Sequence, residues 1–249
     1  MKKLLGFSIF LVFVLIASLT AEAKVTLPAI FSDNMVLQQN TQVNVWGKAA
    51  PGEKVTVKAS WLDKAVTAKA AANGKWTVKL KTPKAITNQS VTVSGENEIT
   101  INNVLIGEVW LCTGQSNMEF PVSRHPDVKW NTGMLNEAEE LKDADYPEIR
   151  LFHVKHQLAH EGELDDCEGE WLVCNPKNLY DFSAVGFVFG RKLYKELKMP
   201  VGLIQSTWGG THAESWTKLD VMKKNPLYAD VLKDFALEGV KQQKNYCKV

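Results

Sequence analysis

The chain of 249 residues has few cysteines and almost no net charge. Four cysteines are too few for a disulfide framework in a chain of this length, and sequence alone leaves their pairing open. No two of them form a CxxC motif, so a structural zinc site is not expected. The formal charge of +1 excludes the strongly basic surface that nucleic acids or anionic membranes attract. A neutral substrate suits this balance as well as an acidic one.

Long apolar runs are also scarce, apart from the N-terminus. Residues 1–23 place two lysines before an apolar stretch and end in an Ala-Glu-Ala cleavage site at Ala23. The stretch is shorter than the roughly 20 residues of a membrane span, which favours a secretory signal peptide. We therefore expect cleavage near Ala23, a secreted or periplasmic protein, and no stable membrane span after cleavage.

Helical periodicity is absent from residues 24–103. Segments such as QVNVWG, EKVTVKASW, KWTVKL and QSVTVSG alternate apolar with polar residues, the pattern of strands with one face toward a core. Pro51-Gly52 marks a chain reversal, and Asn73-Gly74 is typical of a tight hairpin. This region is predicted to be a β-sandwich domain.

The pattern changes after residue 104. EVWLC is a nearly continuous apolar run, typical of a strand covered on both faces in a parallel sheet. Alternating helical and strand patterns follow, which predicts an open, mainly parallel α/β sheet with helices on its faces for residues 104–249. The predicted elements are a helix in 134–145, a strand over 148–154, a helix ending at Leu197 with Phe189 and Leu193 on the same face, and a strand over 201–207.

Two of these strands end in polar, glycine-bearing turns. GQSNM, residues 114–118, would display Ser116 beyond the carboxyl end of a strand, where reactive groups of open α/β sheets gather. A serine in such a turn is also a common helix cap. Gly209 and Gly210 follow the strand over 201–207, and their backbone N–H groups can approach a substrate oxygen. Together the two turns predict a catalytic rim with Ser116 as nucleophile.

Several separate stretches resemble one family. LCTGQSNMEFPV, FSAVGFVFGRKLYKEL and GLIQSTWGGTHAESW, with LPAIFSDNMVLQQNTQVNVWG upstream, are similar to the sialate O-acetylesterase and acetylxylan esterase group of SGNH hydrolases. The resemblance implies a flavodoxin-like SGNH sheet, hydrolysis of O-acetyl esters on carbohydrate through an acyl-serine, and no metal or organic cofactor. It implies Ser116 as nucleophile and an oxyanion hole at Gly209, with Gly210 as the alternative. From their places in the two turns, Gln115, Asn117, Trp208, Thr211 and His212 are candidate substrate contacts, and Trp208 could equally stack on a sugar face or pack against the core.

The chain departs from the family pattern in two places. The 249 residues hold neither a segment like WYQGE nor an Asp-x-x-His motif, which in this family supply an oxyanion donor and the base. We therefore expect the N-terminal portion of a longer enzyme, or a disrupted product, with low or absent activity. Two local histidines are weak substitutes for the base: His212 lies beside a predicted strand end, where a surface or subsite position is favoured, and His125 follows the serine turn.

Two alternatives to an esterase remain open from the sequence. The chain could be a secreted carbohydrate-binding module that holds glycan through Trp46, Trp61 or Trp76, or an inactive remnant without a ligand. The substrate sugar and the oligomeric state are not encoded in any pattern we identify.

Overall fold

The computed structural model describes residues 24–125, 133–159 and 163–234. The predicted signal peptide and Cys247 lie outside these ranges. Within them, none of the helices has the length and apolar character that crossing a bilayer requires.

The strands precede most of the helices along the chain. The strands are β1 (Val36–Gln38), β2 (Gln42–Lys48), β3 (Lys54–Ala59), β4 (Val66–Lys69), β5 (Lys75–Lys81), β6 (Ile86–Ser94), β7 (Glu98–Gly114), β8 (Tyr146–His153), β9 (Trp171–Cys174) and β10 (Val201–Thr207). The helices are α1 (Ser116–Glu119), α2 (Glu137–Lys142), α3 (Pro176–Leu179), α4 (Ala184–Leu197) and α5 (Leu219–Lys223), with 3₁₀ turns η1 (Ala213–Trp216) and η2 (Pro226–Tyr228).

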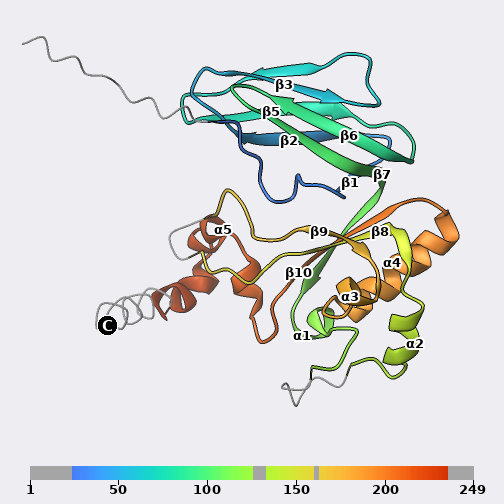
Figure 1. Cartoon of the computed structure of the whole chain (residues 1–249). Coiled ribbons are helices and arrows are strands. Elements are labelled where there is room, and N and C mark those ends of the chain that lie inside the picture. Colours follow the sequence, from blue (N-terminus) through green and yellow to red (C-terminus); the bar gives the residue numbers. More distant parts are fainter. Residues whose placement is uncertain (1–23, 126–132, 160–162, 235–249) are drawn as a thin grey trace, which may run out of the picture.

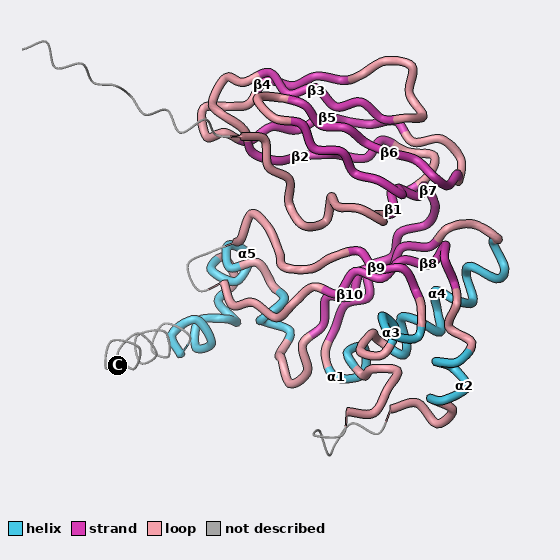
Figure 2. The backbone as a smooth tube through the Cα atoms, viewed as in Figure 1, coloured by secondary structure: helices cyan, strands magenta, loops and turns pink. Residues whose placement is uncertain are grey.

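The fold is mixed α/β. One sheet runs in the order β4-β3-β6-β7-β10-β8-β9, with β1 also paired to β7, and β2 pairs separately with β5. Figure 1 shows strands β2 to β6 gathered at one end of the molecule and helices α1 to α4 at the other, around β8, β9 and β10. Figure 2 shows the same separation, with the helices gathered away from strands β2 to β6.

The alternating segments form strands because each buries every second residue. In β5, Trp76, Val78 and Leu80 are buried, while Thr77 and Lys79 between them are exposed. Side chains from β2 and β5 share one buried cluster with those of the larger sheet, which keeps the two sheets together through apolar burial. The prediction of strands without helices in residues 24–103 is confirmed.

The predicted hairpin at Asn73-Gly74 is wrong, although its turn geometry is right. Gly74 adopts the positive φ of +76° that favours glycine. The flanking strands nevertheless do not pair with each other, because β4 pairs with β3 and β5 pairs with β2. The turn therefore carries the chain from one sheet to the other.

Strand β7 joins the two ends of the molecule. Its first half pairs with antiparallel β6, its middle with parallel β1, and residues from Glu108 to Gly114 with parallel β10. The expected boundary between residues 103 and 104 falls inside this strand. At Gly107 a Cβ would lie 2.0 Å from the Pro200 carbonyl oxygen, so only glycine permits the approach of the chain that enters β10.

Three parallel strands form the part of the sheet that leads to the site. β10 lies between β7 and β8 and is parallel to both. Leu203 on β10 is fully buried, and Gly190 of α4 packs so closely that a Cβ there would meet it at 2.5 Å. The predicted strands over 148–154 and 201–207 are confirmed, as is the helix ending at Leu197.

Two expectations about burial are wrong. Trp110 and Leu111 of β7 are 42% and 62% exposed, because the described residues place a strand beside this part of β7 only on the β10 edge. The expected apolar helix face also points mostly outward, since Phe189 and Leu197 are exposed. Helix α4 instead packs through Ala184, Gly186, Phe187 and Gly190, where small residues allow close contact.

Candidate active site

Ser116 lies where β7 ends and α1 begins. Gly114 closes the strand with a φ of +145°, and the Gln115 side chain caps the helix that Ser116 opens. The exposed Ser116 hydroxyl donates a hydrogen bond of 2.8 Å to Gln115 Oε1, which also accepts from the Ser116 backbone N–H at 3.3 Å. A neutral amide oxygen orients this hydroxyl but does not take its proton at neutral pH.

The end of β10 lies beside this turn. Trp208 N–H donates to the Gly114 carbonyl at 3.1 Å, which joins the two strand ends directly. A Cβ on Gly209 would lie 3.5 Å from Ser116 Oγ, so the glycine backbone and the hydroxyl are neighbours. The two turns that the sequence singled out therefore meet at one edge of the sheet, as parallel strands require.

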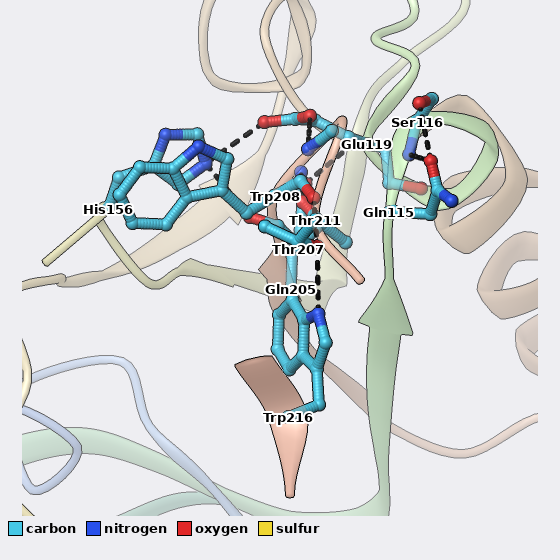
Figure 3. Close-up of polar contacts among 11 residues, drawn as sticks. Gln115, Ser116, Glu119, His156, Gln205, Thr207, Trp208, Thr211 and Trp216 are labelled. Carbon is cyan, nitrogen blue, oxygen red and sulfur yellow. Dashed lines mark hydrogen bonds and ion pairs between the residues drawn. The ribbon is translucent and has the colours of Figure 1, made fainter. Parts of the chain in front are cut away.

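The Glu119 carboxylate accepts the hydrogen bond of the Gly209 backbone N–H. The Gly209 N–H donates to Glu119 Oε2, while Glu119 Oε1 lies 2.9 Å from His156 Nε2 (Figure 3). Glu119 is three residues after Ser116 on α1, so the same short helix supplies the hydroxyl and the carboxylate. In this arrangement a side-chain anion fills the place that a substrate oxygen would need.

His156 is oriented by two acceptors and one ring. Its Nε2 lies 2.8 Å from the Thr207 carbonyl oxygen as well as close to the Glu119 carboxylate. Since both neighbours only accept hydrogen bonds, Nε2 carries the proton and is not a free base. The ring stacks on Trp208 with centroids 4.3 Å apart and planes 4° apart. Trp208 is thus covered by an imidazole in this structure.

A second histidine, His153, is the last residue of β8 and is partly buried. Burial, and then the charge of His156, lowers the pKa of His153, which favours the neutral imidazole. Its ring contacts Phe182 edge to face, with centroids 6.5 Å apart. His153 therefore adds packing rather than a positive charge.

A buried polar network holds the strand ends in place. The buried Gln205 accepts from Ser183 N–H at 2.7 Å and donates to Thr207 Oγ1 at 3.0 Å. Ser183 Oγ in turn accepts from Gly186 N–H and caps helix α4. Buried polar groups that are fully paired fix a single arrangement of the elements that carry them. Figure 3 shows Gln205 and Thr207 beneath the Trp208 turn.

The remaining sequence candidates lie around this edge. Asn117 lines a pocket of about 410 Å³ together with Gly114, Gln115, Ser116, Met118 and Val185. Thr211 Oγ1 donates to the Trp208 carbonyl and accepts from Trp216 Nε1–H at 2.8 Å, which fixes the turn after β10. Gly210 has a φ of +78° and open space on its Cβ side, and His212 is exposed before η1.

Neither histidine considered as a local base is bonded to Ser116 in the described residues. His125 Nε2 lies 2.6 Å from Asp181 Oδ1 and its ring contacts Tyr180. The structure instead brings His156 and Glu119 to the site, which the sequence analysis did not select. Glu119 carried a signal, its spacing of three from Ser116, whereas His156 lies in a loop without a periodic pattern.

The described cysteines are free and differ in burial. Cys112 and Cys174 are buried free thiols, and Cys167 is half-buried and free. Across the described ranges, no three His, Cys, Asp or Glu side chains are arranged to hold a metal ion.

A family model, curated relatives and a solved structure all relate this chain to carbohydrate acetylesterases. Residues 106–245 match the family described as carbohydrate esterase, sialic acid-specific acetylesterase. Sialate O-acetylesterase of Mus musculus is 33% identical over 215 residues, covering 78% of this chain, and that of Homo sapiens is 31% identical over 205 residues, covering 75%. A crystal structure of a carbohydrate acetylesterase from Xanthomonas citri aligns with a TM-score of 0.69 and 32% identity, over 78% of this chain and 42% of that one. The chain spans only 38% of the mouse protein and 37% of the human one.

Proposed function

The chain belongs to the sialic acid-specific acetylesterase family of carbohydrate esterases, and on this premise we propose that it takes part in hydrolysing acetyl esters on sugars. The observation that carries the proposal is the contact between two strand ends, where the Gly209 backbone adjoins the Ser116 hydroxyl. An acyl-transfer site needs a nucleophile and an oxyanion donor on the same side of one carbonyl group.

The proposed reaction begins with attack of Ser116 Oγ on the acetyl carbonyl carbon. The N–H groups of Ser116 and Gly209, with Gly210 as the alternative, stabilise the negative charge that develops on the carbonyl oxygen. The sugar hydroxyl leaves, and water releases acetate from the acyl-serine. Around this centre, Gln115, Asn117, Trp208, Thr211 and His212 are the proposed sugar contacts.

Both proposed oxyanion donors are engaged by side chains in the structure. Gln115 Oε1 accepts from Ser116 N–H, and Glu119 Oε2 accepts from Gly209 N–H. A substrate oxygen must displace these two acceptors before it is stabilised. We infer that Gln115 and Glu119 move when an ester binds.

The proton of Ser116 is the weak point of the reaction in this chain. Its hydroxyl bonds to Gln115 Oε1, and within the described residues no imidazole is hydrogen-bonded to it. Loss of the base from a serine hydrolase lowers kcat by several orders of magnitude, while oxyanion stabilisation retains part of the acceleration. We therefore propose slow turnover by the 249-residue chain itself.

Membership of this family also supports proposals about the domains, the export and the substrate of the chain. We propose that residues 24–103 form a β-sandwich and that residues 104–249 form the N-terminal portion of a flavodoxin-like SGNH sheet. The buried cluster shared by the two sheets, and the parallel order β7-β10-β8, support these assignments. We also propose export through residues 1–23, serine chemistry without a metal or organic cofactor, and an O-acetylated sugar as the substrate.

The test is release of acetate from O-acetylated sialic acid, with and without added imidazole as a diffusible base. We expect slow release that imidazole accelerates and that Ser116→Ala abolishes. Ser94→Ala, which changes a half-buried serine on β6 away from the site, is the matched control and leaves the rate unchanged. Equal release by Ser116→Ala and the unmodified chain would show that Ser116 is not the nucleophile.

A further inference from the structure

A second pocket lies beside β2 and β5. It measures about 340 Å³ and is bounded by these two strands, by the segment 26–28 and by Asp165 and Asp166 of the loop between β8 and β9. Figure 1 places β2 and β5 at the end of the molecule away from α1, which carries Ser116. None of its lining residues belongs to the pocket around Ser116.

Trp46 gives this pocket an aromatic wall. Its ring is 40% exposed and is held by an edge-to-face contact with the buried Phe31, with centroids 4.6 Å apart. Position 46 belongs to the outward-facing set of β2, whereas Trp76 on the paired strand is only 2% exposed. Trp61 donates its indole N–H to the Lys81 carbonyl. Trp61 does not line this pocket, so Trp46 is the exposed tryptophan in its lining.

Charged groups of both signs lie beside the ring. Lys48 and Lys75 are cross-strand neighbours, and both ammonium groups contact Asp165, with Lys48 Nζ 3.1 Å from Oδ2. The hydrogen bonds from Lys75 and then Lys48 lower the pKa of Asp165, which keeps it a carboxylate. Asp166 accepts from the Ala29 backbone N–H at 3.0 Å, which ties the loop to the strands.

This combination matches the chemistry of a pyranose ring. The C–H face of a sugar buries apolar surface on an indole, while its hydroxyls need donors and acceptors at the rim. Ammonium groups supply only donors and a carboxylate only acceptors, so Lys48, Lys75 and Asp165 together satisfy adjacent hydroxyl groups. A ring fixed before binding loses little conformational freedom when it is covered.

We propose that the Trp46 pocket is a non-catalytic carbohydrate subsite. The sugar ring stacks on Trp46, and its hydroxyl or carboxylate oxygens lie between Lys48, Lys75 and Asp165. The subsite goes beyond the proposed esterase function, because it involves neither Ser116 nor the Gly209 turn. A neutral and an acidic pyranoside share this chemistry, and the two are separated by experiment.

The experiment measures binding of xylotetraose and of 3′-sialyllactose to the Ser116→Ala chain by saturation-transfer NMR and calorimetry. Ser116→Ala removes turnover, so the outcome does not depend on whether the chain is an esterase. We expect at least one of the two sugars to bind and Trp46→Ala to weaken that binding at least tenfold. Trp110→Ala removes a tryptophan of similar exposure outside the pocket and leaves binding unchanged.

Asp165→Asn provides a second variant that touches no core residue. It weakens binding of the neutral sugar, because an acceptor is lost, and strengthens binding of the acidic sugar, because the two lysines are released. Circular dichroism confirms that each variant is folded. The proposal is overturned if neither sugar binds, or if a folded Trp46→Ala variant binds as tightly as its parent.

Discussion

Removing the Glu119 side chain is expected to accelerate the reaction of Ser116 with electrophilic acyl and phosphonyl reagents. Glu119 Oε2 accepts from the Gly209 N–H, which is the donor that we propose for the incoming oxygen. Glu119→Ala deletes this acceptor and leaves His156 bonded to the Thr207 carbonyl. The Gly209 N–H is then free for the oxyanion.

The size of the effect follows from the contacts that a substrate must break. A hydrogen bond to a charged group contributes about 1.5–3 kcal/mol. The ion pair between Glu119 and His156 is partly exposed, with 21% and 39% of the two side chains accessible, so it adds at most about 1 kcal/mol. Solvent screening favours the lower end of the sum, which corresponds to an increase in rate of roughly tenfold.

The assay is the second-order rate constant for labelling of Ser116 by a fluorophosphonate, followed by mass spectrometry. Its phosphoryl oxygen needs the same backbone donors as an ester carbonyl, and one labelling event suffices for detection. Glu140→Ala is the control, because it removes another paired carboxylate, the partner of Arg191, away from the pocket around Ser116. A folded Glu119→Ala variant that is labelled no faster than the parent would refute the reasoning.

Three further predictions concern stability and thiol reactivity. The hydrogen bond from Arg191 lowers the pKa of Glu140 in the folded chain. The ionised Glu140 therefore stabilises the fold at pH values above its pKa in the unfolded chain, and this stabilisation is lost as the pH falls through its pKa in the folded chain. Urea unfolding should therefore show Glu140→Gln to be less stable than the parent at pH 7, with the difference vanishing in acid. Burial raises the pKa of Cys174 to about 12, so iodoacetamide should modify Cys174 only after denaturant unfolds the chain, and later than the half-buried Cys167. Gly107→Ala should lower the free energy of unfolding by about 1–3 kcal/mol in the same urea titration, because the Cβ of the alanine would meet the Pro200 carbonyl oxygen. An unchanged unfolding midpoint would contradict that close contact.

Most of the strands could be predicted from the periodicity of apolar residues within single segments. The alternation in β2 and β5 and the apolar run of β10 are patterns of single segments, and each became a strand because one face or both faces could be buried. The run EVWLC was misread in part. Its apolar residues are typical of a strand covered on both faces, but Trp110 and Leu111, which point to opposite faces, remain exposed.

Pairing between distant segments was harder to predict. The turn at Gly74 was recognised from its residues, yet nothing local distinguishes a hairpin from a passage between sheets. The meeting of Ser116 with Gly209 could be anticipated, because ends of parallel strands share an edge. The approach of His156 could not, since its position depends on the path of a loop and on stacking against Trp208.

Strand β7 runs without interruption from the end of the molecule that holds β2 to β6 to the turn that carries Ser116. A strand of 17 residues spans at most about 56 Å, and this one is paired with β6, β1 and β10 along most of its length. The strand that carries Trp46, β2, packs against the same sheet through the buried cluster that it shares with β7. If both proposals hold, a polysaccharide bound at Trp46 would present to Ser116 only those acetyl groups that lie at a fixed distance from the bound sugar. Decoration spaced otherwise would be left untouched until the polymer let go and rebound.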